Sequence, residues 1–173
     1  MKVEAARGAL NAVNPDVAVV AVHMRVEDFG ELVSAADAVL DCTDNFATRH
    51  AVNRACVKHR KPLVSGAAIR FDAQLMVFDL RKPASACYAC LFPEDAQVEE
   101  VQCSTMGVFA PLTGVVGAMQ AMEALKLAAG IGESLDGRLM IFDAKGADWR
   151  TVRVKKDPAC SVCRSRTARG CAA

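Results

Sequence analysis

The sequence carries almost no net charge. Its 173 residues include 21 lysines and arginines against 20 aspartates and glutamates, which gives a formal net charge of +1. This balance excludes a nucleic-acid-binding protein that relies on bulk positive charge, and it argues against a polybasic membrane anchor. Apolar residues make up 53% of the chain and charged residues 24%, which is typical of a packed domain and not of a disordered one.

Segments that direct a protein to or across a membrane are also lacking. The first residues, MKVEAARGALNAVNPDV, are interspersed with charges and lack the apolar core of a signal peptide, so we expect a cytoplasmic protein. The most apolar stretch, residues 111–130, has polar residues spaced three apart on one helix face, which predicts an amphipathic helix with Met122 and Leu125 toward the core. The polar residues are Gln120, Glu123 and Lys126.

Apolar residues recur along the chain with the periods of helices and strands. Their order predicts an α/β fold with a mostly parallel sheet covered on both faces and antiparallel strands at its edge. We expect one domain over residues 1–163 and a flexible tail over residues 164–173. The expected helices are residues 3–12, 27–36, 46–59 and 111–130, and the expected strands are residues 17–22, 38–42, 62–69, 74–80, 138–143 and 149–154.

The eight cysteines are many for an intracellular chain, and four of them form two CxxC pairs. Cys87 pairs with Cys90, and Cys160 with Cys163. Each pair lets two thiolates reach one ion from a tight turn, and two pairs complete a closed tetrahedral site. We therefore predict a structural Zn²⁺ ion that joins the C-terminal end to the central loop. Four unrelated thiols or a redox-active CxxC are the alternatives.

A second motif, LDCTDN at residues 40–45, lies where a predicted strand leads into a helix. Ligands of open α/β sheets gather beyond the carboxyl ends of the strands. Asp44 is suited to hold Mg²⁺ on the phosphates of a nucleotide, because carboxylate oxygens are hard ligands, and Asn45 can hydrogen-bond the ligand beside it. The alternative is that Asp44 or Asn45 only caps the N-terminus of the helix.

The remaining cysteines have no CxxC partner. Cys103 follows the central loop in polar, glycine-containing surroundings, where an exposed thiol can act as a nucleophile or a sulfur acceptor, or have no function. Cys42 and Cys56 fall on core-facing positions, where thiols pack as small apolar groups. Cys171 lies in the tail, and the three histidines show no ligand spacing.

Several segments, in this order, are similar to the MoeB/ThiF/HesA family. They are LDCTDNFATRHAVNRAC, PLVSGAAIRFDAQLMVFD, CYAC, the segment from Cys103 to Val108 with Pro111 after it, GVVGAMQAMEALKLAAG and DPACSVC. The resemblance covers residues 2–163 and implies a Rossmann-like fold. Members of this family are adenylyltransferases that activate ubiquitin-like sulfur-carrier proteins, and they are bacterial relatives of ubiquitin-activating enzymes.

The resemblance implies ATP-dependent adenylation of the C-terminal glycine of a carrier that ends in Gly-Gly. The carrier carboxylate attacks the α-phosphate of ATP·Mg²⁺, and the products are a carrier acyl-adenylate and pyrophosphate. A sulfurtransferase or cysteine desulfurase then supplies the sulfur of a thiocarboxylate for molybdopterin or thiamine synthesis. The resemblance also implies a homodimer.

The same resemblance assigns roles residue by residue. Asp44 matches an aspartate that positions Mg²⁺ and the phosphates, and Asn45 matches its neighbour at the nucleotide. Lys2 matches a lysine that contacts the ATP phosphates. Cys103 matches a cysteine that links covalently to the carrier in some members and is dispensable in others. The two CxxC pairs match the ligands of the structural zinc.

The chain departs from the family pattern at its start. It contains no GxGxxG or GxGGLG phosphate loop, and it also lacks the acidic ribose-binding residue and the Arg-containing segment that contacts ATP across the dimer. We therefore expect an N-terminally truncated fold that exposes a sheet edge or a hydrophobic face. The alternative function is an inactive remnant that folds around zinc and binds a carrier or another partner. A tRNA-modifying cyclase of the same superfamily fits the paired CxxC motifs less well.

Overall fold

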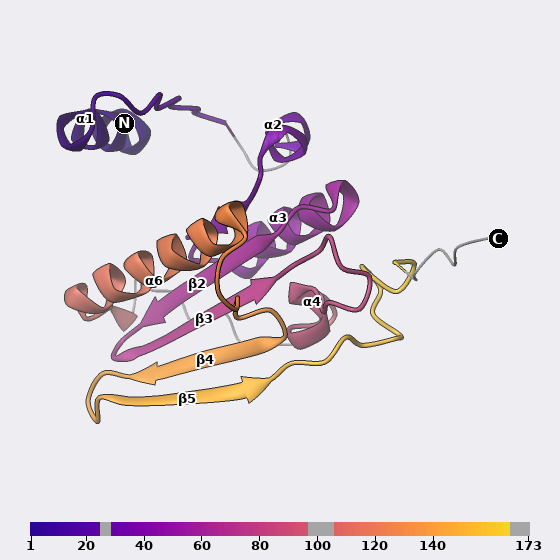
Figure 1. Ribbon diagram of the computed structural model, residues 1–173. Coiled ribbons are helices and arrows are strands. Elements are labelled where there is room, and N and C mark those ends of the chain that lie inside the picture. Colours follow the sequence, from indigo (N-terminus) through magenta and orange to yellow (C-terminus); the bar gives the residue numbers. More distant parts are fainter. Residues whose placement is uncertain (25–28, 97–105, 167–173) are drawn as a thin grey trace.

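The computed structural model describes residues 1–24, 29–96 and 106–166. A sheet of five strands, in the order β1-β2-β3-β4-β5, forms the centre of the molecule (Figure 1). The helices are α1 (Lys2–Val13), α2 (Gly30–Ala35), α3 (Phe46–His59), α4 (Tyr88–Leu91) and α6 (Ala110–Ala129). The strands are β1 (Val39–Asp41), β2 (Leu63–Ile69), β3 (Asp72–Phe78), β4 (Arg138–Asp143) and β5 (Asp148–Arg153). Among these helices, none is both long and apolar enough to span a bilayer.

The sheet is mixed, so the prediction of a mostly parallel sheet is wrong for the described strands. β1 pairs with β2 in parallel, and the other pairings, β2–β3, β3–β4 and β4–β5, are antiparallel. The connections explain three of the four pairings, because α3 provides the long crossover that the parallel pair of β1 and β2 needs. The short turns at residues 70–71 and 144–147 can only reverse the chain. The predicted C-terminal hairpin of β4 and β5 is confirmed.

The predicted strand at residues 17–22 does not form. These residues belong to no strand of the described sheet and to none of its core clusters, and Val17 and Val20 are 53% and 81% exposed. A β-branched run that is apolar on both faces needs neighbours that cover both faces. The structure shows no such cover here, and β1 is consequently an edge strand of the described sheet.

Different helices cover the two faces of the sheet. Side chains alternate along β2 and β3, so that Leu63 and Met76 point to one face, and Val64 and Leu75 point to the other. The first face packs against α3 and α4 and contains the larger apolar cluster. The second face packs against α6, which contributes Leu127. Period-two alternation in the central strands thus builds an apolar layer on each face.

The helix α6 turns its polar residues toward the sheet, which contradicts the predicted orientation. Gln120 and Glu123 are 3% and 6% exposed, whereas Met122 and Leu125 are 54% and 66% exposed. The spacing of three does place the polar residues on one face. That face meets main-chain groups of the strands and loops that need hydrogen-bond partners, and polar side chains satisfy them. The exposed residues of α6 include no charged side chain.

Gly66 in β2 lies directly beneath Gln120. A Cβ atom at this position would overlap the amide group of Gln120 and lie 2.8 Å from Cγ1 of Val116. We therefore expect Gly66→Ala to lower the free energy of unfolding by about 1–3 kcal/mol in urea denaturation. The control is Gly117→Ala on the outer side of α6, where a Cβ atom meets nothing within 4 Å. Equal stability of the two variants would contradict this packing.

The two cysteines predicted to lie in the core differ in burial. Cys56 is fully buried, as predicted, and burial raises the pKa of its thiol to about 12. The prediction for Cys42 is wrong, because this residue is exposed. It follows Asp41, the last residue of β1, so the inward and outward alternation of the strand no longer applies to it. Its thiol donates to Oε1 of Gln120 at 3.5 Å.

Candidate functional site

The loop between β1 and α3 is held in one conformation by a buried carboxylate. Asp41 is 2% exposed, and its Oδ1 accepts from the main-chain N–H and the hydroxyl of Thr43, at 3.0 and 2.7 Å. Its Oδ2 accepts from the hydroxyl of Ser65 in β2 at 3.0 Å. The buried guanidinium of Arg49 donates to the main-chain oxygen of Thr43 at 2.6 Å. These contacts fix the loop that carries Asp44 beyond the carboxyl end of β1.

Asp44 and Asn45 have different roles in the local structure. Asn45 is the N-cap of α3, and its side-chain oxygen accepts from the N–H of Thr48 at 2.8 Å. Its side-chain nitrogen donates to Oδ1 of Asp44 at 3.4 Å. Asp44 caps nothing, and its carboxylate is exposed. The capping alternative therefore holds for Asn45 and leaves Asp44 open to a ligand.

Lys2 is not brought to this loop. It is exposed at the start of α1, and its side chain makes no hydrogen bond or ion pair with a described residue. The helix α1 buries none of its residues and stands apart from the sheet (Figure 1). Cys103 and Cys171 lie outside the described residues. The predicted roles of Lys2 and Cys103 stay predictions.

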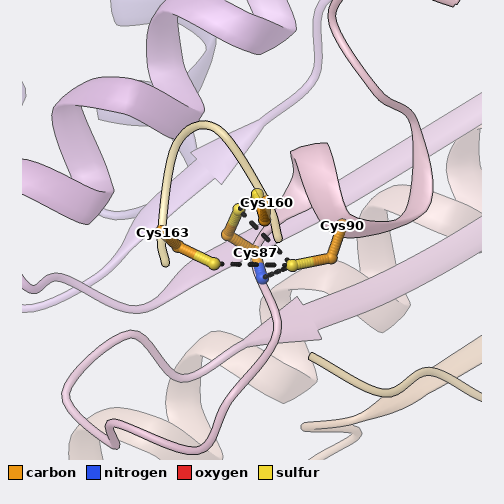
Figure 2. Close-up of side chains that lie close together, drawn as sticks. All are labelled: Cys87, Cys90, Cys160 and Cys163. Carbon is orange, nitrogen blue, oxygen red and sulfur yellow. Dashed lines mark hydrogen bonds between the residues drawn. The ribbon is translucent and has the colours of Figure 1, made fainter. Parts of the chain in front are cut away.

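The four cysteines of the two CxxC pairs converge on one point (Figure 2). Their sulfur atoms all lie within 4.8 Å of one another. The sulfurs of Cys87 and Cys160 are 3.7 Å apart, those of Cys87 and Cys90 are 3.9 Å apart, and those of Cys90 and Cys163 are 3.4 Å apart. A tetrahedral zinc ion with Zn–S bonds of about 2.3 Å requires sulfurs about 3.8 Å apart. The cluster therefore has the size of a four-thiolate metal site.

Each CxxC pair lies in a tight turn. Cys87 is the N-cap of α4, and the N–H of Cys90 donates to its main-chain oxygen at 3.0 Å. In the second turn, the N–H of Arg164 donates to the main-chain oxygen of Cys160 at 3.1 Å. The guanidinium of Arg166 then donates to the main-chain oxygens of residues 80 and 82, at 2.8 and 2.6 Å. These contacts tie the second turn to the end of β3.

The thiols of the cluster differ in acidity. The hydrogen bond between the thiols of Cys87 and Cys90 lowers the pKa of Cys90. The same bond raises the pKa of Cys87, and burial raises the pKa of Cys163 to about 12. Of these three thiols, Cys90 is therefore the one that ionises first. A bound metal would hold its cysteines as thiolates, because only thiolates are ligands.

Three residues that the sequence patterns did not single out support the two candidate sites, which are the loop of Asp44 and the four-cysteine cluster. Asp41 and Arg49 hold the loop of Asp44, and Asn53 in α3 contacts the first CxxC turn. The sequence offered one signal, the aspartate two residues before Thr43 at the end of a strand, since aspartate often hydrogen-bonds the main chain two residues on. Nothing in the local sequence of α3 indicates that Asn53 faces a sulfur atom.

The comparison with protein families decides the identity of the chain. A family model described as the ThiF family matches residues 1–162. The chain belongs to the ThiF family. The predicted MoeB/ThiF/HesA resemblance is thereby confirmed. The residues matched include β1, the LDCTDN loop and α3.

Two Escherichia coli K12 proteins are similar to this ThiF-family chain over most of its length. Molybdopterin-synthase adenylyltransferase is 42% identical over 166 residues, which cover 94% of this chain and 65% of the relative. Sulfur carrier protein ThiS adenylyltransferase is 42% identical over 165 residues, which cover 94% of this chain and 64% of the relative. The chain therefore spans a little less than two thirds of the length of these curated relatives.

Solved structures share the fold. The MccB protein of Escherichia coli, solved with ATP, superposes with a TM-score of 0.71 at 20% identity, over 95% of this chain and 51% of that chain. The protein PaaA superposes with a TM-score of 0.61 at 12% identity, over 88% of this chain and 55% of that chain. The predicted Rossmann-like α/β fold is confirmed in this coarser form, with a mixed sheet.

Proposed function

We propose that this protein adenylates the C-terminal glycine of a ubiquitin-like sulfur-carrier protein, with ATP and Mg²⁺. The similarity to two sulfur-carrier adenylyltransferases, each 42% identical across 94% of this chain, carries the proposal. The exposed Asp44 beyond the end of β1 supports it, because that end of an α/β sheet is where ligands bind. The adenylate serves sulfur transfer in molybdopterin or thiamine-type cofactor synthesis.

The proposed reaction forms one bond and breaks one. An oxygen of the carrier carboxylate attacks the α-phosphorus of ATP, the bond from that phosphorus to the bridging oxygen breaks, and pyrophosphate leaves. Mg²⁺ offsets the charge that grows on the leaving group. The carboxylate of Asp44 would hold the Mg²⁺ ion. The side-chain N–H groups of Asn45 lie beside this carboxylate and could donate to the nucleotide. The role proposed for Lys2 at the ATP phosphates rests on the family resemblance, because α1 stands apart from the sheet.

We propose Zn²⁺ as the ion of the four-cysteine site, since soft thiolates in a tetrahedron select zinc over Mg²⁺. All four ligand positions are filled by Cys87, Cys90, Cys160 and Cys163, so the ion has no open position for chemistry. Its role is structural, and it links the turn at α4 to the turn after β5. A reducing compartment such as the cytoplasm keeps these thiols available.

We propose a sulfurtransferase or cysteine desulfurase as the second partner. The adenylate activates the carboxylate and brings no sulfur, so a sulfur donor has to follow. One relative from Drosophila sechellia, 42% identical over 167 residues, is named adenylyltransferase and sulfurtransferase MOCS3. The match covers 36% of that relative. We propose that a separate protein supplies to this one the sulfurtransferase activity that the relative's name includes.

We propose that a second copy of the protein covers the outer face of α6. Met122 and Leu125 are 54% and 66% exposed there, and exposed apolar faces of this kind mark interfaces. Leu125→Glu should convert a dimer into monomers in size-exclusion chromatography with light scattering. The matched control is Val152→Glu on β5, whose valine is 49% exposed and which should stay dimeric. A wild-type monomer would contradict the proposal.

Exchange of labelled pyrophosphate into ATP tests the proposed activity. We expect exchange that requires both Mg²⁺ and a carrier protein ending in Gly-Gly. A carrier that lacks its last glycine is the control and should support only background exchange. Background exchange with the intact carrier would contradict the proposed adenylation.

A further inference from the structure

Asn53 is a fully buried amide between α3 and the first CxxC turn. It is 0% exposed and lies eight residues into α3, on the face that packs against α4. A buried amide without partners destabilises a core, so each of its polar atoms needs a hydrogen bond. Its neighbour in the chain, Val52, and its two hydrogen-bond partners, Cys87 and Tyr88, all belong to the larger apolar cluster.

Two hydrogen bonds determine how the amide of Asn53 is oriented. Its Oδ1 accepts from the main-chain N–H of Tyr88 at 3.0 Å. Since only the oxygen can accept, the Nδ2 group must face the other way, and it donates to Sγ of Cys87 at 3.7 Å. One side chain therefore holds both the first cysteine of the turn and the residue after it.

The sulfur of Cys87 needs such a donor. Cys87 is 0% exposed, so water cannot stabilise a thiolate at this position. Four thiolates around one divalent cation leave two negative charges in an apolar core, and charge buried without partners is costly. Apart from the cysteines themselves, Asn53 is the one side chain in the described ranges that donates a hydrogen bond to a sulfur of the cluster.

We infer that Asn53 is a positioning residue of the four-cysteine site, which orients Cys87 and sets the affinity of the site for its metal. The inference rests on the proposed zinc site. Groups that hydrogen-bond a metal ligand from outside typically change metal affinity 10–100-fold when they are removed. Asn53 also links the metal site to α3, the helix whose N-cap is Asn45.

Competition for zinc between the full chain and a chromogenic chelator tests the inference. We expect Asn53→Ala and Asn53→Asp to raise the dissociation constant for zinc by about 10–100-fold. Asn53→Asp has the same shape and keeps the acceptor for the N–H of Tyr88, but it places a carboxylate against the thiolate. It therefore removes the donated hydrogen bond, keeps the accepted one and adds a negative charge beside Cys87, and it decides the question if Asn53→Ala does not fold.

Two controls separate this role from general stability. Arg54→Ala changes the next residue, an exposed arginine paired with Glu94 at 2.6 Å, and Gly66→Ala destabilises the far face of the sheet. Both should bind zinc within about twofold of the wild type. With Co²⁺ in place of zinc, the thiolate-to-metal charge-transfer band should shift in the Asn53 variants and not in the controls.

The outcomes are distinguishable. A wild-type chain that binds no zinc would overturn the proposed metal site together with this inference. A wild type that binds one zinc ion, with Asn53→Asp and Asn53→Ala within twofold of its affinity, would overturn the inference alone. In neither case would the adenylation proposal be affected, because no nucleotide or carrier enters the experiment.

Discussion

We expect Cys160→Ser to abolish the proposed zinc binding and to lower the midpoint of thermal unfolding by roughly 10 °C. Cys160 is 4% exposed, and its sulfur lies 3.7 Å from that of Cys87. Zinc at 1,000 times its dissociation constant stabilises the folded state by about 4 kcal/mol, and each kcal/mol shifts the midpoint of a chain of this size by about 2–4 °C. Metal analysis and differential scanning calorimetry measure both effects.

Cys56→Ser is the matched control for this prediction. Cys56 is also a buried cysteine, with 0% exposure, but it lies outside the four-cysteine cluster. The control should lose stability and retain one zinc ion per chain. The wild type treated with a strong chelator should unfold at the temperature of Cys160→Ser. Full zinc content in Cys160→Ser would refute the four-cysteine site.

Asp44→Ala should reduce carrier-dependent pyrophosphate exchange by about 10²–10³-fold, the usual effect of removing one group that stabilises transition-state charge. The carboxylate is exposed at the carboxyl end of β1 and caps no helix, so its loss should leave the fold intact. Circular dichroism and the unfolding midpoint check that the fold is retained. A change confined to exchange would support a role for Asp44 at the nucleotide.

Asp37→Ala is the control for Asp44→Ala. Asp37 is also exposed, and it lies just before β1, at the opposite end of the same strand. It should exchange pyrophosphate at the wild-type rate. Exchange by Asp44→Ala within threefold of that rate would contradict the role proposed for Asp44.

Features that depend on short stretches of sequence could be predicted well. The two CxxC pairs converge as predicted, because each pair holds two thiols in one tight turn and two such pairs together suit one tetrahedral ion. The helix α3 and the loop before it were also predicted, since Asn45 caps the helix that the apolar stripe indicates. The family resemblance covered the chain because these motifs occur in order.

Features that depend on distant neighbours could not be predicted. The run at residues 17–22 has strand propensity, but a strand needs partners on its edges and cover on its faces, and propensity reports neither. The spacing of Gln120 and Glu123 correctly placed them on one face of α6, but that face was expected to point to solvent and instead points to the sheet. The main-chain groups that they bind belong to other elements, which the spacing does not reveal. Asn53 faces Cys87 only through the packing of α3 on α4.

The most direct test of the proposed function is the intact mass of a Gly-Gly carrier protein after incubation with this protein, ATP and Mg²⁺. We expect a new species heavier than the carrier by one adenylyl group, formed only when the terminal carboxylate is free. It should disappear when a thiol or sulfur donor is added, as the acyl-adenylate is consumed. An unchanged carrier mass, with a zinc-loaded and folded protein in the reaction, would contradict the account.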